Sequence, residues 1–72
     1  MDGFVWMKER APATPGDYTV FRRTGPRGGL ATENGYYWDG KDWWTRSMYL
    51  SKAVAAWVDP ELAKREQEPK HE

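Results

Sequence analysis

Cysteine is absent from this chain of 72 residues, and its single histidine is His71. Disulfides and thiolate metal sites are therefore excluded, and a histidine-based zinc site would need several ligands at fixed spacing. With one histidine and no cysteine, the usual nucleophile–base pairs cannot be assembled. We therefore expect a protein that is not an enzyme and that uses no metal or other cofactor.

Net charge and long apolar runs are also lacking. Lys+Arg and Asp+Glu both number 11, so the formal net charge is zero, unlike the basic domains dedicated to nucleic acids. No apolar run approaches the roughly 20 residues of a transmembrane helix, and Met1-Asp2-Gly3 opens without the basic and apolar parts of a secretory signal. We therefore expect a cytoplasmic protein that does not bind membranes.

Aromatic residues are abundant instead, with five tryptophans and four tyrosines, and the densest run spans residues 36–44. Each ring can remove roughly 150–250 Å² from water, so a few rings can replace the disulfide or metal that a small domain often needs. This composition predicts a single small domain over residues 1–62. A helix end and a frayed, charged tail are expected at residues 63–72.

Short segments rich in β-branched and aromatic residues alternate with glycine and proline, which predicts strands joined by turns. Strands are expected at residues 17–23, 30–38, 43–46 and 53–58, while residues 4–7 form a first strand or an extended arm, and residues 47–52 a loop or a helical turn. In the first long strand, we expect Tyr18 and Val20 to face the core and Phe21 to be partly covered. Trp6 near the start and Val54 and Trp57 near the end are further core candidates.

Two short motifs predict how the strands and the helix are bounded. Asp39-Gly40 indicates a tight hairpin turn, because type I′ turns need positive φ at both central residues. The alternative is a four-residue loop from Asp39 to Asp42, and turn chemistry accounts for Asp39 without a catalytic role. Asp59 can cap a helix that has Pro60 at its first position. The expected fold is α+β, a small three- to four-stranded antiparallel sheet with a short C-terminal helix.

Alternation along the strands predicts that some rings stay outside the core. Tyr36 and Trp38 face one way and Tyr37 the other, and Trp43 and Trp44 oppose each other. The register is open, so either of these two tryptophans can be the exposed one. Because exposed aromatic patches mark interaction surfaces, we expect Tyr37, Trp43 and Trp44 to bind a partner protein. A weak homodimer is the alternative to a hetero-partner, and a monomer is expected otherwise.

An arginine-rich loop offers a second candidate surface. Arg22, Arg23 and Arg27 stand among three glycines in residues 22–29, a composition found on surfaces that bind single-stranded nucleic acids. The segment lacks the Lys-Ser/Thr pair of a P-loop, and a solvated hairpin loop also explains it. Because three arginines neutralise few phosphates, binding would be weak. The three arginines are kept as part of the partner surface, and weak nucleic-acid binding as the alternative function.

The order of the aromatic, proline and glycine residues also resembles a known family. The matching residues are Trp6, Pro12, Pro15, Gly16, Val20, Tyr36, Tyr37, Gly40, Trp43, Trp44, Val54, Trp57 and Pro60. They resemble short phage and prophage proteins that share the domain of unknown function five-five-one, over about residues 4–62. This chain departs from the family at Ala11, where leucine is usual, and at Ala56, where histidine is usual.

The resemblance implies a phage-related source and a small antiparallel β or α+β fold, and it implies no reaction. Together with the surplus of aromatic residues, it leads us to expect a non-enzymatic phage or prophage accessory protein. Its partner would be a host or phage protein, bound through an aromatic surface. Inhibition of a host defence or regulatory protein is one form that such an action could take.

Overall fold

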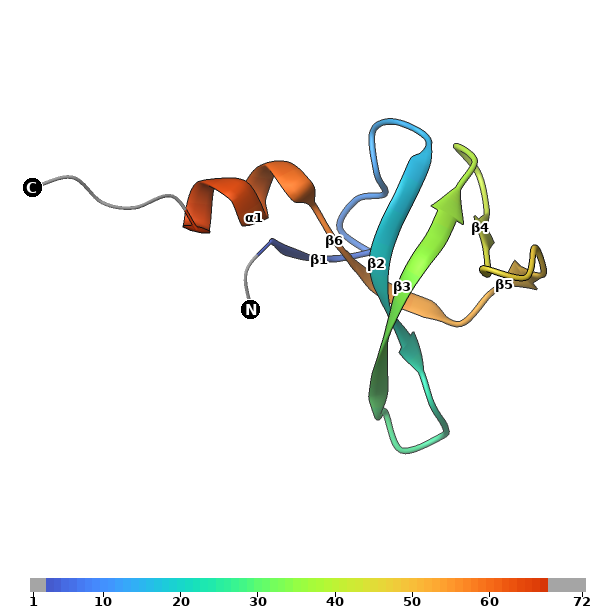
Figure 1. Ribbon diagram of the computed structural model, residues 1–72. Helices are drawn as coiled ribbons and strands as arrows, with labels where there is room; N and C mark the ends of the chain where they lie inside the picture. Colours follow the sequence, from blue (N-terminus) through green and yellow to red (C-terminus); the bar gives the residue numbers. More distant parts are fainter. Residues whose placement is uncertain (1–2, 68–72) are drawn as a thin grey trace, which may run out of the picture.

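A computed structural model describes residues 3–67 of the chain, with side chains up to Lys64. The elements are β1 (Phe4–Trp6), β2 (Gly16–Arg23), β3 (Leu30–Trp38), β4 (Trp43–Trp44), β5 (Leu50–Ser51), β6 (Val54–Val58) and α1 (Pro60–Gln67) (Figure 1). The end of the expected tail, including His71, lies outside the described residues. In this part of the chain, the helix is neither long nor apolar enough to cross a membrane.

All six strands belong to one antiparallel sheet in the order β1-β6-β2-β3-β4-β5. The expected antiparallel sheet with a short helix is confirmed, but the expected number of three to four strands is wrong, and the fold is mainly a sheet. The two edge strands account for part of the difference. With three and two residues, β1 and β5 are shorter than the runs from which alternation predicts a strand. Pairing with β6 and β4 makes them strands.

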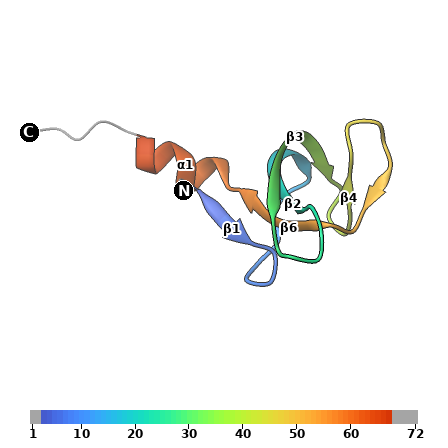
Figure 2. The ribbon, with the colours of Figure 1, turned by 90° about the horizontal axis from the view of Figure 1, so that it is seen from below.

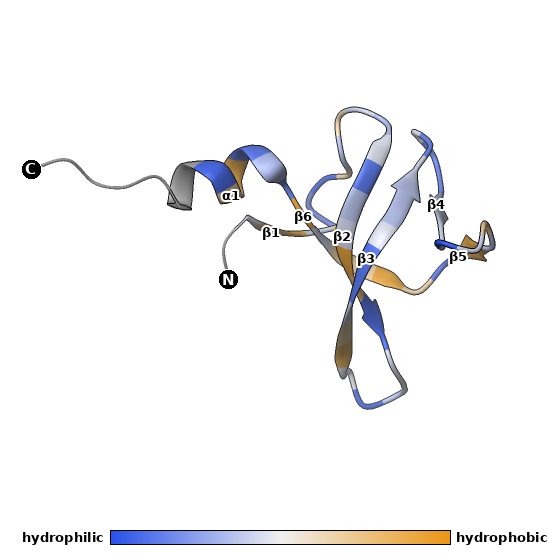
Figure 3. Ribbon diagram, viewed as in Figure 1, coloured by the Kyte–Doolittle hydropathy of each residue, from blue (hydrophilic) through white to orange (hydrophobic). Residues whose placement is uncertain are grey.

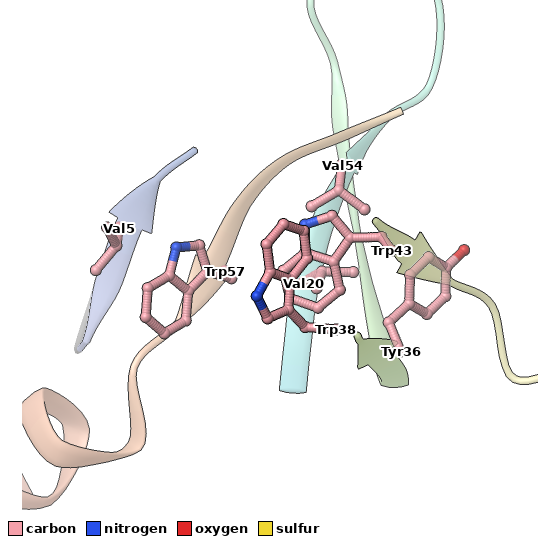
Figure 4. Packing of buried hydrophobic residues seen from close by; sticks show 7 residues of the cluster. All are labelled: Val5, Val20, Tyr36, Trp38, Trp43, Val54 and Trp57. Carbon is pink, nitrogen blue, oxygen red and sulfur yellow. The ribbon is translucent and has the colours of Figure 1, made fainter. Parts of the chain in front are cut away.

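The core lies on one face of the sheet, which curves around it. Its buried members are Val5, Val20, Tyr36, Trp38, Trp43, Val54 and Trp57 (Figure 4). The Nε1 atom of Trp43 in β4 donates a hydrogen bond to Sδ of Met7, just after β1, at 3.4 Å. Because β1 and β4 stand far apart in the strand order, this contact requires a strongly curved sheet. Burial of Val20, Val54 and Trp57 confirms three expected core positions, and half-buried Tyr18 packs against the cluster. The expected core position of Trp6 is wrong, because Trp6 is 38% exposed and packs on Phe4 instead.

A bulge in β3 keeps the aromatic residues of the core on one face. Tyr18 pairs with Tyr36 and Val20 with Glu33, so an advance of two residues along β2 corresponds to three residues along β3. Without the extra residue, Tyr36 would turn away from the core, because each single-residue slip exchanges the faces. Gly35 supplies the bulge conformation with φ of 76°, a value that glycine adopts without strain.

The hairpin between β3 and β4 has a four-residue loop, with Trp38 paired to Trp43. The prediction of a tight Asp39-Gly40 turn is therefore wrong, and the alternative four-residue loop forms instead. The Asp39 carboxylate accepts hydrogen bonds from the backbone N–H groups of Lys41 at 2.8 Å and Asp42 at 2.6 Å. This side-chain cap stabilises the wider loop, in which positive φ is needed at Gly40, at 99°.

The C-terminal helix begins as expected. Asp59 accepts a hydrogen bond from the Glu61 N–H on its carboxylate and one from the Ala63 N–H on its carbonyl, with Pro60 at the first helical position. Leu62 packs against the core cluster, so the helix closes an end of the core. In both views, α1 and the β4–β5 connection lie at opposite ends of the molecule (Figure 1, Figure 2).

Candidate functional site

A row of large side chains crosses three strands on the face opposite the core. Tyr37 of β3 pairs with Trp44 of β4, which in turn pairs with Leu50 of β5. Their neighbours Trp38 and Trp43 are buried in the core, and successive side chains alternate between faces. These pairings place Tyr37, Trp44 and Leu50 side by side on the outside of the sheet, and we call them the outer row.

The turn between β4 and β5 carries two more exposed apolar side chains, next to the row in the sequence. Met48 and Tyr49 are strongly exposed, and Met48 has φ of 68°, which is uncommon for a residue with a side chain. Thr45 holds the turn by accepting hydrogen bonds from the N–H of Met48 on its carbonyl and from that of Tyr49 on its hydroxyl. The outer row together with Met48 and Tyr49 is called the outer patch, and Figure 3 shows apolar colouring at its outer end, on β5.

The size of the outer patch follows from the exposure of its members. The exposed fractions are 38% for Tyr37, 68% for Met48, 72% for Tyr49 and 45% for Leu50. At about 200 Å² for each large side chain, these four present roughly 450 Å² to solvent. An apolar area of this size is typical of the largest patch on a monomer, which is often functional.

The aspartate of the hairpin loop fixes the ring at the centre of the outer row. The indole Nε1 of Trp44 donates a hydrogen bond to Asp39 Oδ2 at 2.8 Å. The N–H of Asp42, this indole and the N–H of Lys41 together hold the pKa of Asp39 below its ordinary value. Asp39 thus stays ionised near neutral pH and keeps the half-buried Trp44 in one orientation. A ring held in place loses little further freedom on binding.

Of the three aromatic residues that the sequence predicted for partner binding, two lie in this patch and one does not. Tyr37 and Trp44 are direct cross-strand neighbours, whereas Trp43 is buried in the core, 5.1 Å from Trp38 between ring centroids. The prediction for Trp43 is corrected, because the register of the four-residue loop turns its ring inward. Partner binding at Tyr37 and Trp44 stays a prediction.

The other three members of the patch were not predicted from the sequence as binding residues. Met48, Tyr49 and Leu50 are consecutive, and they fall in a segment expected to be a loop or a helical turn. Three large apolar residues in a row are unusual in a turn, where polar residues are the rule. That contrast is the signal that could have revealed them.

The three candidate arginines lie elsewhere in the fold. Arg22 forms an ion pair with Glu33 at 2.8 Å, whose hydrogen bond and charge raise the pKa of the guanidinium. Arg23 pairs with Leu30 at the far end of the β2–β3 hairpin, and Arg27 lies in the connecting loop. At about 3.3 Å per residue, this end is roughly 20 Å from Tyr37. The structure does not bring these arginines to the outer patch. Binding of a partner protein or of a nucleic acid at Arg22, Arg23 and Arg27 stays a prediction.

A groove of about 380 Å³ lies near the start of α1. Arg10 binds Asp59 Oδ2 at 2.8 Å and stacks on the Trp57 ring at 5.2 Å, and the hydrogen bond from Arg10 is the main cause that lowers the pKa of Asp59. Tyr18 donates its hydroxyl hydrogen to the carbonyl of Thr14 at 2.8 Å. These groups satisfy one another, so the groove ties the β1–β2 loop to the helix and shows no converging set of polar groups for a ligand.

A smaller aromatic cluster covers the outer face at the other side of the sheet. Phe4 packs edge-on to Trp6 at 4.9 Å and against Phe21 at 5.0 Å, and Lys8 lies 5.9 Å above the Trp6 ring. Phe21 is buried, rather than partly covered as expected. The cluster shields the second face of β2 and β6, and less of it is exposed than of the outer patch.

The described residues form no metal site, since no three His, Cys, Asp or Glu side chains lie close together within residues 3–64.

Comparison with protein-family models, curated proteins and solved structures finds no match to this chain. The resemblance to phage and prophage proteins therefore stays an expectation based on the quoted residues.

Proposed function

We propose that this protein is a non-enzymatic binding protein that attaches to a partner protein through the outer patch. The observation that carries the proposal is the row Tyr37–Trp44–Leu50, continued by exposed Met48 and Tyr49, on a sheet whose core already contains other rings. Four of the six exposed large hydrophobic residues in the described chain belong to this patch. Tyrosine and tryptophan are the residues that most often dominate binding energy at interfaces.

The mode of action that fits this surface is steric. A ring fixed by Asp39 and flanked by exposed apolar side chains can cover a site on another protein. The resemblance to phage and prophage proteins supports a host or phage protein as the partner, and inhibition of a host defence or regulatory protein belongs to the same proposal. A weak homodimer would use the same patch.

The experiment compares capture of bacterial proteins by the immobilised full chain and by two matched variants. Tyr49→Ser/Leu50→Ser removes exposed apolar groups from the patch, and Leu30→Ser removes a similar group at the opposite end of the β2–β3 hairpin. All three side chains are at least 40% exposed, so both variants are expected to stay folded. Circular dichroism and the urea midpoint verify this.

The proposal predicts saturable capture of a defined protein by the wild type and by Leu30→Ser. Capture should be about tenfold weaker or lost with Tyr49→Ser/Leu50→Ser, because truncated interface hot spots cost this much or more. Equal capture by all three proteins would place the interaction outside the patch. No saturable capture by any of them, together with a concentration-independent monomer mass in light scattering, would overturn the proposal.

A further inference from the structure

The outer patch offers roughly 450 Å² of exposed apolar side chains. An area of this size can anchor either a folded surface or a short segment of a partner. The free strand edge and the charges beside the patch favour the segment.

The free edge of β5 favours an extended segment. The strand order ends at β5, so nothing within the described chain pairs with its outer side. Thr45 donates its N–H to the Tyr49 carbonyl at 2.8 Å. Thr45 and Tyr49 are therefore a hydrogen-bonded pair, and Trp44 and Leu50 are the pair next to it. Antiparallel pairs alternate, so the N–H and C=O of Leu50 point away from β4, toward the open edge. An added strand can bond to them directly.

The charges beside this edge are positive. Between Trp43 and Val58 the sequence contains Arg46 and Lys52 and no acidic residue. Both are exposed, and neither forms an ion pair with a described residue. The side chain of Arg46 lies over the outer face at Gly35, since a Cβ added there would be 3.3 Å from Arg46 Cγ. Positive charge thus borders both β4 and the end of β5.

Two acidic residues lie along the outer row, beside Tyr37 and Trp44 rather than at β5. Asp17 pairs with Tyr37 at the opposite end of the row, and the Asp39 carboxylate is already bonded to two backbone N–H groups and to Trp44. The apolar surface therefore has a basic side at the free edge. Complementary charge at an interface increases the association rate and selects the partner.

Resting on the proposed function, we propose that the outer patch binds an extended segment of the partner that carries apolar side chains and carboxylates. The segment adds to the edge of β5 and hydrogen-bonds to Leu50. Its apolar side chains lie on Leu50 and Trp44, and its carboxylates lie beside Arg46 and Lys52.

The test selects short random peptides on the immobilised full chain, with Tyr49→Ser/Leu50→Ser as counter-selection. The expected result is enrichment of peptides that combine at least two large apolar residues with Asp or Glu, and loss of these peptides on the counter-selected variant. If enriched peptides depend on the patch but are neutral or basic, the charge assignment is overturned while the proposed function stands. If no peptide depends on the patch, this inference is overturned, and capture of a folded partner decides the proposed function separately.

Charge reversal then tests the contact itself by fluorescence anisotropy with a labelled selected peptide. Arg46→Glu/Lys52→Glu should weaken binding about tenfold or more, and the same peptide with Asp and Glu changed to Lys should bind this variant better than the wild type. Arg23→Glu/Arg27→Glu is the control with the same change in charge at the remote loop, and it should bind like the wild type. Absence of the reciprocal rescue would overturn the proposal.

A competition experiment with a polyanion distinguishes a protein segment from a nucleic acid as the ligand of the patch. A single-stranded oligothymidylate should fail to displace the selected peptide, because it lacks the apolar side chains that cover the patch. Displacement that depends on Arg46 and Lys52 would instead identify a nucleic-acid strand stacked on Trp44 and Tyr49, and would overturn the assignment to a protein partner.

Discussion

Replacing each of the two adjacent tryptophans of β4 by alanine should have very different costs. Trp43 is 4% exposed and packs against Trp38 and Tyr18, so Trp43→Ala should cost about 3–5 kcal/mol of unfolding free energy. A 72-residue domain has about 4–11 kcal/mol in total. Trp43→Ala should therefore lose a large part of that stability.

Trp44→Ala removes a half-buried ring and one hydrogen bond to Asp39. Loss of part of the ring's burial and of a hydrogen bond of about 1 kcal/mol gives about 2 kcal/mol in total. With a urea slope of about 1 kcal/mol per molar, the midpoint should fall by about 2 M, against about 3–5 M for Trp43→Ala. Urea unfolding followed by far-ultraviolet circular dichroism measures both. Equal shifts, or a larger shift for Trp44→Ala, would refute the register that turns Trp43 inward.

Three further predictions concern the turns of β3 and β4. Gly40→Val should cost about 1–2 kcal/mol from positive φ alone, since no atom lies within 4 Å of an added Cβ; Gly25→Val, also in open space, should cost less in the same urea assay. Gly35→Ala should cost more than Gly40→Ala, because its Cβ would crowd Arg46, and equal midpoints would contradict this. Folding lowers the pKa of Asp39 from an ordinary 3.8. The ionised carboxylate therefore stabilises the folded state fully above pH 3.8, and this stabilisation is lost as the pH falls through the folded-state pKa. In Asp39→Asn, the urea midpoint should accordingly fall less as the pH is lowered below 3.8 than it does in the wild type. The same fall in both proteins would show that Asp39 is not the group responsible.

The long strands and the helix start were predictable because their signals are local. Val20 in a β-branched run, Gly16 before it and the Asp59-Pro60 cap each act through their own backbone preferences. The edge strand β5 was not predictable in the same way, whereas residues 4–7 were already a strand candidate. Leu50–Ser51 becomes a strand because β4 pairs with it, and nothing in two residues alone indicates a partner.

The hairpin loop shows why the site was only partly predictable. Asp39-Gly40 has the residues of a tight turn, but the Asp39 carboxylate also caps the wider loop, so the same residues suit both arrangements. The choice settles which tryptophan is buried, because a different register exchanges the faces. Tyr37 was placed outside in either case, whereas Trp43 and Trp44 could not be told apart. The basic border at Arg46 and Lys52 depends on the fold and was missed.

Binding at the outer patch can be tested most directly by the oxidation of Met48 in dilute peroxide. Its side chain is 68% exposed and lies within the patch, while half-buried Met7, which is hydrogen-bonded to Trp43, serves as the internal control. With the captured partner or a selected peptide at saturation, the oxidation rate of Met48 read by mass spectrometry should fall about tenfold or more, and that of Met7 should stay the same. An unchanged Met48 rate in the saturated complex would contradict binding at the outer patch.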